Sequence, residues 1–146
     1  MSEIDNTRVL LVDDEKDFLT TLADRLQLRD LKVRTASRGE DALEVIGTAD
    51  VDVVVLDLSM PGMDGLQTLK RIKEQVPESE VIILTGHGSI RAGVEAMKLG
   101  ADDFLEKPVD INQLLEKIEE AKQKRVLVLQ SKSRDEIEKI LKARSW

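Results

Sequence analysis

The chain has 146 residues and a formal net charge of −7, which suits one domain with a modest extension. Its 41% of hydrophobic residues can form a core and its 35% of charged residues suit a polar surface, while the acidic balance argues against the main body binding nucleic acid. The absence of cysteine excludes disulfides and thiolate zinc sites and is compatible with a cytoplasmic location, and no apolar run is long enough to span a membrane.

Apolar runs that resemble strands alternate with amphipathic segments five times along the chain. The third and fourth runs are apolar throughout, which is typical of a parallel sheet covered by helices on both faces, whereas segment 32–36 alternates and indicates an edge strand. The fold class is therefore α/β, a doubly wound five-stranded parallel sheet with right-handed crossovers. We expect strands at 9–12, 32–36, 52–56, 81–84 and 103–105, and helices at 15–29, 37–47, 64–76, 90–100 and from 110 to at least 118.

Charged and polar side chains follow four of the five predicted strands. Asp13 and Asp14 follow the first strand, and Asp57 follows the third. Thr85 follows the fourth strand, and Lys107 stands near the end of the fifth. Ligands of open α/β sheets bind beyond the carboxyl ends of the strands, so these side chains form one candidate site. The turn after the first strand carries no glycine-rich motif, and its carboxylates would repel a pyrophosphate.

The three carboxylates predict a magnesium site. Three negative charges in one cleft repel one another unless a cation joins them, and Mg²⁺ prefers oxygen ligands. Ionised Asp57 can then attack a phosphorus atom and form an aspartyl-phosphate. Lys107 would neutralise charge on the moving phosphoryl group, and the Thr85 hydroxyl would donate a hydrogen bond to one of its oxygens.

Four motifs in this order resemble the receiver domain of two-component response regulators. The resemblance covers roughly residues 8–122 and implies a flavodoxin-like fold with strand order 2-1-3-4-5. It places a receiver domain at 1–124 and leaves 125–146 as a C-terminal extension, which we expect to be helical. The motifs are Asp13-Asp14, Asp57 with Met60-Pro61-Gly62-Met63-Asp64-Gly65, Thr85-Gly86, and Phe104-Leu105-Glu106-Lys107-Pro108.

The resemblance implies a role for each acidic residue. Asp57 would be the phosphoacceptor, taking a phosphoryl group from a histidine of a sensor kinase or of a phosphotransfer protein. Asp14, Asp57 and the backbone carbonyl of Ser59 would bind Mg²⁺ directly, and Asp13 would act mainly through water. The expected function is thus a phosphorylation switch that catalyses only its own phosphoryl transfer and dephosphorylation, and not an enzyme acting on external substrates.

The resemblance also implies a switch pair and a partner surface. Thr85 would move toward the phosphoryl group, and the Phe104 ring would turn inward behind it. Phe104 replaces the tyrosine or histidine often found there, so the switch would rest on packing alone. The surface of the fourth helix, fifth strand and fifth helix would then bind a downstream effector or output domain. Ser59 and His87 are further candidates, because residues near the pocket could tune the lifetime of the phosphate.

Three alternatives stay open at this point. Asp13-Asp14 could simply be favoured at a helix N-terminus by the helix dipole. An aspartate-nucleophile phosphatase of the haloacid dehalogenase type is the enzyme alternative, but Ser59 stands where such enzymes usually place their acid/base aspartate. A receiver-like adaptor that works without phosphate is the third, and it requires that partner binding be independent of Asp57.

The C-terminal segment exceeds what a minimal receiver needs. From Lys122 onward it carries eight basic residues against three acidic ones. Val126 to Leu129 could prolong the fifth helix or pack back on the body, and the spacing of Ser133 and Glu136 predicts the start of a separate helix. Candidate partners are a second copy, the kinase or an effector, with nucleic acid the weakest. A complete chain would be a stand-alone receiver, and a fragment would continue into an output domain.

Overall fold

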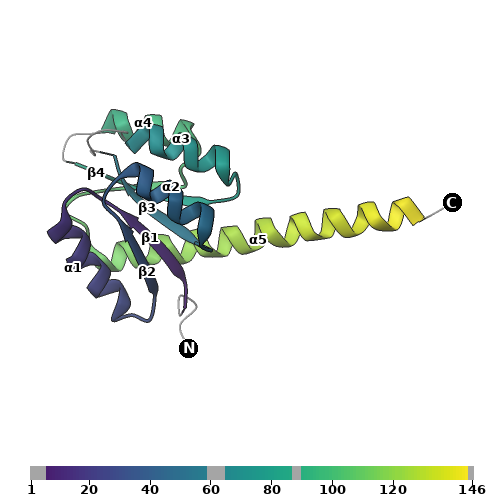
Figure 1. Ribbon diagram of the computed structural model, residues 1–146, viewed down its shortest axis with the longest axis horizontal. Coiled ribbons are helices and arrows are strands. Elements are labelled where there is room, and N and C mark those ends of the chain that lie inside the picture. The colour runs from purple at the N-terminus through teal and green to yellow at the C-terminus, as the bar shows by residue number, and fades with distance from the viewer. Residues whose placement is uncertain (1–5, 59–64, 87–89, 145–146) are drawn as a thin grey trace.

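The computed structural model describes residues 6–58, 65–86 and 90–144, and strands and helices alternate through them (Figure 1). In chain order the elements are β1 (Arg8–Val12), α1 (Lys16–Gln27), β2 (Lys32–Ala36), α2 (Gly39–Thr48), β3 (Val53–Asp57), α3 (Gly65–Gln75), β4 (Glu80–Thr85), α4 (Ile90–Lys98), β5 (Asp103–Glu106) and α5 (Ile111–Arg144).

The five strands form one parallel sheet in the order β2-β1-β3-β4-β5. This confirms the predicted fold and strand order. Every residue of β3 and β4 is buried, as expected of central strands with helices on both faces, whereas β2 is largely exposed and lies at the edge.

Alternate residues of the strands feed two apolar clusters, one on each face of the sheet. The first cluster joins the strands to α1 and α5, and the second joins them to α2, α3 and α4. Successive strand side chains point to opposite faces, so each central strand contributes to both clusters. Representative members are Val9, Val55, Leu26 and Ile118 in the first cluster, and Leu10, Leu56, Ile72 and Ala96 in the second.

Helix α5 is a single element of 34 residues that extends far beyond the sheet (Figure 1). The extension is therefore helical, as predicted, but the separate helix expected at Ser133 is wrong, because the helix passes through this residue without a break. A serine and a glutamate three residues apart also occur in the middle of a helix, on a face that is exposed to water. Side chains 129–143 are all exposed.

Ion pairs attach the middle of α5 to the amino ends of the strands. Arg125 contacts Asp52 at 2.7 Å and Lys124 contacts Asp102 at 2.6 Å, and both carboxylates are largely buried. Lys132 reaches Glu78 at 3.3 Å in a more exposed pair. The helix thus leaves the body on the side opposite the carboxyl ends of the strands.

Within the described ranges, no helix combines the length and apolar character that crossing a membrane requires.

Candidate functional site

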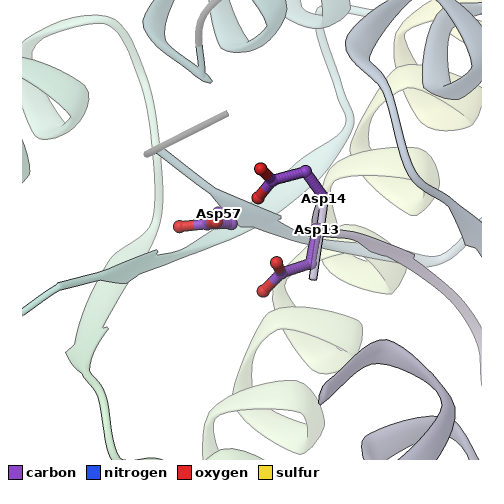
Figure 2. A group of neighbouring side chains, drawn as sticks. All are labelled: Asp13, Asp14 and Asp57. Carbon is purple, nitrogen blue, oxygen red and sulfur yellow. The ribbon is translucent and has the colours of Figure 1, made fainter. Parts of the chain in front are cut away.

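The carboxyl ends of β1 and β3 bring three aspartates together. Val12 pairs with Leu56 in the parallel register, so the residues that follow them lie side by side. Oxygen atoms of Asp13, Asp14 and Asp57 all lie within 4.8 Å of one another. Figure 2 shows the three side chains directed toward a shared space. The sequence prediction that these residues meet at one sheet edge is confirmed.

Local hydrogen bonds hold Asp13 at the end of β1. Its amide donates to the carbonyl of Ala36 at 3.1 Å, which ties the turn to β2. Its Oδ1 accepts a hydrogen bond from the amide of Glu15 at 2.9 Å, next to the start of α1. Together the two bonds hold Asp13 between the end of β2 and the start of α1.

The aspartates differ in their access to water. Asp13 and Asp57 are each 2% exposed, whereas Asp14 is exposed. Buried carboxylates require a cation or hydrogen-bond donors. Three carboxylates with one accessible side suit a hard divalent ion such as Mg²⁺, which takes oxygen ligands and keeps several waters. The donor set therefore fits a magnesium site.

Lys107 supplies a positive charge to the same site. Its Nζ lies 2.8 Å from Asp13 Oδ2 and 3.7 Å from Asp57 Oδ2. Burial lowers the pKa of Lys107, but the hydrogen bond with Asp13 and the charges of Asp57, Asp13 and Glu15 outweigh burial and raise it above its ordinary value. The ammonium is therefore charged at neutral pH and stands beside the carboxylate of Asp57.

Two residues of the site have no signal in the sequence. Glu15 Oε1 lies 3.7 Å from Lys107 Nζ, and the ring centroid of Phe18 lies 4.3 Å from the same nitrogen. Phe18 lies in α1 and is partly buried against the apolar cluster that joins the strands to α1 and α5. Only the tertiary fold places its ring under the ammonium, where a cation–π interaction restrains Lys107.

Thr85 and Phe104 lie on the neighbouring strands β4 and β5. Thr85 ends β4 and is buried, and its hydroxyl donates to the carbonyl of Leu105 at 3.5 Å. Phe104 pairs with Ile83 and is half-buried. Thr85 thus stands at the carboxyl edge that carries the acidic cluster, whereas Phe104 stands two residues before the end of β5, on the face of the sheet that α4 covers. Ser59 and His87 lie outside the described residues, so the expectations for them stay predictions.

Comparison with known protein families agrees with the geometry of this site. The model of the response regulator receiver domain matches residues 9–119, most of the chain. The chain belongs to this family. Receiver domains are the switch domains of two-component systems, they bind Mg²⁺ at an acidic pocket, and they pair with histidine kinases and output domains.

Relatives of this receiver domain include much longer regulators. It is 40% identical over 130 residues to the C4-dicarboxylate transport transcriptional regulatory protein DctD of Pseudomonas aeruginosa, and the match covers 87% of this chain and 28% of DctD. It is 39% identical over 113 residues to the DNA-binding transcriptional regulator NtrC of Escherichia coli, covering 77% of this chain and 24% of NtrC. This receiver domain thus spans about a quarter of the length of these relatives.

Solved structures show the same fold. A response regulator receiver domain protein from Clostridium thermocellum has a TM-score of 0.80 and 35% identity, with 84% of this chain and 98% of that chain covered. NtrX from Brucella abortus, solved in complex with ATP, has a TM-score of 0.82 and 35% identity, with 87% of this chain and 29% of that chain covered.

Proposed function

We propose that this receiver domain accepts a phosphoryl group on Asp57. The observation that carries the proposal is the set of three clustered carboxylates with the Lys107 ammonium 3.7 Å from Asp57 Oδ2. An Asp57 oxygen forms the new bond to phosphorus while the bond to the donor breaks: the phosphorus–nitrogen bond of a phosphohistidine, whose imidazole leaves with the electron pair. Lys107 balances charge on the phosphoryl oxygens as they approach Asp57.

Mg²⁺ would be held by Asp14, Asp57 and the Ser59 carbonyl, with Asp13 acting mainly through water. When bound, the ion supplies positive charge at the phosphoryl oxygens. Asp13 also accepts the hydrogen bond that holds Lys107 in place. In this proposal Asp13 therefore contacts the Lys107 ammonium directly and Mg²⁺ through water.

The donor would be a sensor histidine kinase or a phosphotransfer protein. Phosphorylation would draw the Thr85 hydroxyl toward the new phosphoryl group and turn the Phe104 ring inward, which changes the partner preference of the surface formed by α4, β5 and α5. The downstream partner would be an effector protein or an output domain. In this proposal the domain catalyses only its own phosphoryl transfer and dephosphorylation, and Ser59 and His87 tune the lifetime of the phosphate.

Mass spectrometry of the intact protein tests the proposal. With Mg²⁺ and acetyl phosphate, we expect a gain of one phosphoryl group, and we expect no gain for Asp57→Asn, which keeps the size of the side chain but removes the nucleophilic carboxylate. Turnover of a model phosphate ester would instead favour the phosphatase alternative. Partner binding that persists unchanged in Asp57→Ala would favour the adaptor alternative.

We further propose that α5 pairs with α5 of a second copy. Val126, Leu129, Ile137 and Ile140 are between 40% and 54% exposed. Their spacings of three and eleven residues place them on one face, because eleven residues make about three helical turns. An isolated helix of this kind is marginal in water, and a two-fold axis would present each copy with an apolar face of matching length.

The proposed function also carries an expected domain division and an expected location. We propose a receiver domain at 1–124 and an extension at 125–146, although α5 crosses this limit as one helix. The absence of cysteine is compatible with a cytoplasmic location, and the acidic composition makes nucleic acid an unfavourable partner for this chain.

A further inference from the structure

The ring of Phe104 rests directly on the backbone of α4 at Gly93. A β-carbon added to Gly93 would lie 3.1 Å from Cδ2, 3.2 Å from Cγ and 3.3 Å from Cε2 of that ring. Carbon atoms attract best at about 3.5–4.0 Å, so a side chain at position 93 and the ring cannot both keep their places. Gly93 is buried, and the ring is what occupies the space beside it.

The contact lies beside an exposed apolar face of α4. Ile90, Val94 and Met97 follow one another at spacings of four and three residues, which puts them on one side of the helix, and the buried Gly93 lies at the flank of that side. They are 69%, 45% and 40% exposed. The Phe104 ring therefore packs on the buried flank of α4, next to this exposed face.

A glycine inside a helix carries a cost in stability relative to alanine, because its backbone loses more freedom on folding. Gly47 in α2 carries the same cost, but there an added β-carbon would meet only the end of the flexible Gln75 side chain, at 3.1 Å. Gly93 and Gly47 thus differ in what lies beside them: an aromatic ring at Gly93 and the end of a flexible side chain at Gly47.

We propose that Gly93 is the positioning residue for Phe104, and that its missing side chain forms a seat for the ring on α4. While the ring occupies the seat, the space beside Gly93 is filled. When the ring turns inward, that space opens at the flank of the face formed by Ile90, Val94 and Met97, and the surface presented to a partner changes. The inference deepens the proposed function, since it rests on Phe104 being part of the switch.

The chain offers a direct readout, because it contains only two phenylalanines, Phe18 and Phe104. Labelling with para-fluorophenylalanine gives one fluorine NMR signal from each ring, and Phe18→Leu assigns them. In the absence of any phosphodonor, we expect Gly93→Ala to shift the Phe104 signal in the direction that acetyl phosphate and Mg²⁺ shift it in the unsubstituted protein. The Phe18 signal, which reports on the surroundings of Lys107, should stay in place.

The control is Gly47→Ala, which makes the same change in another helix and should leave both signals unmoved. A Phe104 signal unmoved by Gly93→Ala, or moved equally by Gly47→Ala, overturns the proposal. A signal that Gly93→Ala moves against the direction produced by the phosphodonor overturns the link to switching. If the unsubstituted protein gains no phosphoryl group, the proposed function fails, while the donor-free comparison still decides whether Gly93 seats the ring.

Thermal unfolding keeps the proposal testable if Gly93→Ala folds poorly. In the Phe104→Leu background the seat is vacated, so Gly93→Ala should raise Tm as Gly47→Ala does, whereas in the unsubstituted protein it should lower Tm or leave it unchanged. An equal effect of Gly93→Ala with and without the Phe104 ring contradicts the seat.

Discussion

The Lys107 ammonium is held from two sides, by carboxylates and by an aromatic ring. Its distances to Asp13 and to the Phe18 ring centroid are 2.8 Å and 4.3 Å. An ammonium fixed in this way needs little rearrangement when a phosphoryl group arrives, which favours catalysis by a preorganised charge. The role of Phe18 in this arrangement can be separated from its role in the core.

We predict that Phe18→Leu slows phosphoryl gain from acetyl phosphate about twofold to thirtyfold, because a partly buried cation–π contact contributes about 0.5–2 kcal/mol, while Asp13 still holds the ammonium. Phe18→Tyr keeps the ring face and should stay near the unsubstituted rate. The rate is measured by intact mass against time at saturating Mg²⁺. An unchanged rate in Phe18→Leu would show that the ring does not restrain Lys107.

At the residue scale, the sequence predicts the position of a site residue only where that residue stands at the end of a recognisable strand. Asp13, Asp57 and Thr85 could be placed because strand ends can be predicted from short apolar runs, and parallel strands end at one edge. The contact between Phe18 and Lys107 joins residues far apart in the chain. Its existence depends on where the fold places α1 relative to Lys107, which follows β5, and no local pattern encodes that.

At the scale of elements, the amino ends of β4 and β5 carry a second titrating group of residues. Glu80 begins β4, is 4% exposed and lies 3.9 Å from Lys124. Burial, the hydrogen bond with Asp102 and the negative charge of Asp102 raise the pKa of Glu80 to about 8, against the influence of Lys124. Glu80 is therefore largely protonated at neutral pH, and Asp102 carries the charge that Lys124 neutralises.

The raised pKa of Glu80 predicts how stability depends on pH. Between its ordinary pKa of 4.5 and about 8, the folded state keeps a proton that the unfolded state has lost, so the free energy of unfolding falls as pH rises through this window. Glu80→Gln removes the titration and should flatten the fall, with Tm a few degrees above that of the unsubstituted protein at about pH 9. Thermal unfolding across the pH range measures both.

Glu78→Gln is the matched control. Glu78 has a lowered pKa, chiefly through its own backbone hydrogen bond, so its contribution changes only under acidic conditions. The Glu78→Gln variant should therefore lose stability between neutral and alkaline pH as the unsubstituted protein does. If Glu80→Gln and the unsubstituted protein lose stability in parallel as pH rises, Glu80 does not hold the extra proton.

The strands illustrate what sequence can predict about elements, and α5 illustrates what it cannot. All five strands were predicted close to their observed limits: burial on both faces leaves a continuous apolar run in the central strands, and the exposed edge strand β2 shows an alternating pattern instead. Ser133 has the spacing of a helix start, yet it lies inside α5. A capping pattern becomes a helix start only if the preceding backbone is not helical, and residues 111–133 contain no glycine or proline that would interrupt the helix.

At the scale of the whole molecule, the projecting part of α5 predicts self-association. Light scattering with size-exclusion chromatography should give a mass that rises from 16.4 kDa toward twice that value as concentration increases. Ile137→Glu with Ile140→Glu places charges on the proposed interface in both copies and should weaken association at least about a hundredfold.

Leu28→Glu is the control for that experiment, because Leu28 is 84% exposed and stands at the C-terminal end of α1, outside α5. It should associate as the unsubstituted protein does. A mass that stays at 16.4 kDa over the full concentration range contradicts pairing through α5, and this outcome would favour a different protein as the partner of the extension.

The proposed switch requires that Asp57, and no other residue, carries the phosphoryl group. The protein is treated with acetyl phosphate and Mg²⁺, reduced with borohydride, which converts an aspartyl-phosphate to homoserine, and then cleaved for peptide mass spectrometry. We predict homoserine at position 57 and unmodified aspartate at positions 13 and 14. Aspartate at position 57 after full treatment, or homoserine at either of the other two positions in its place, would contradict the central claim.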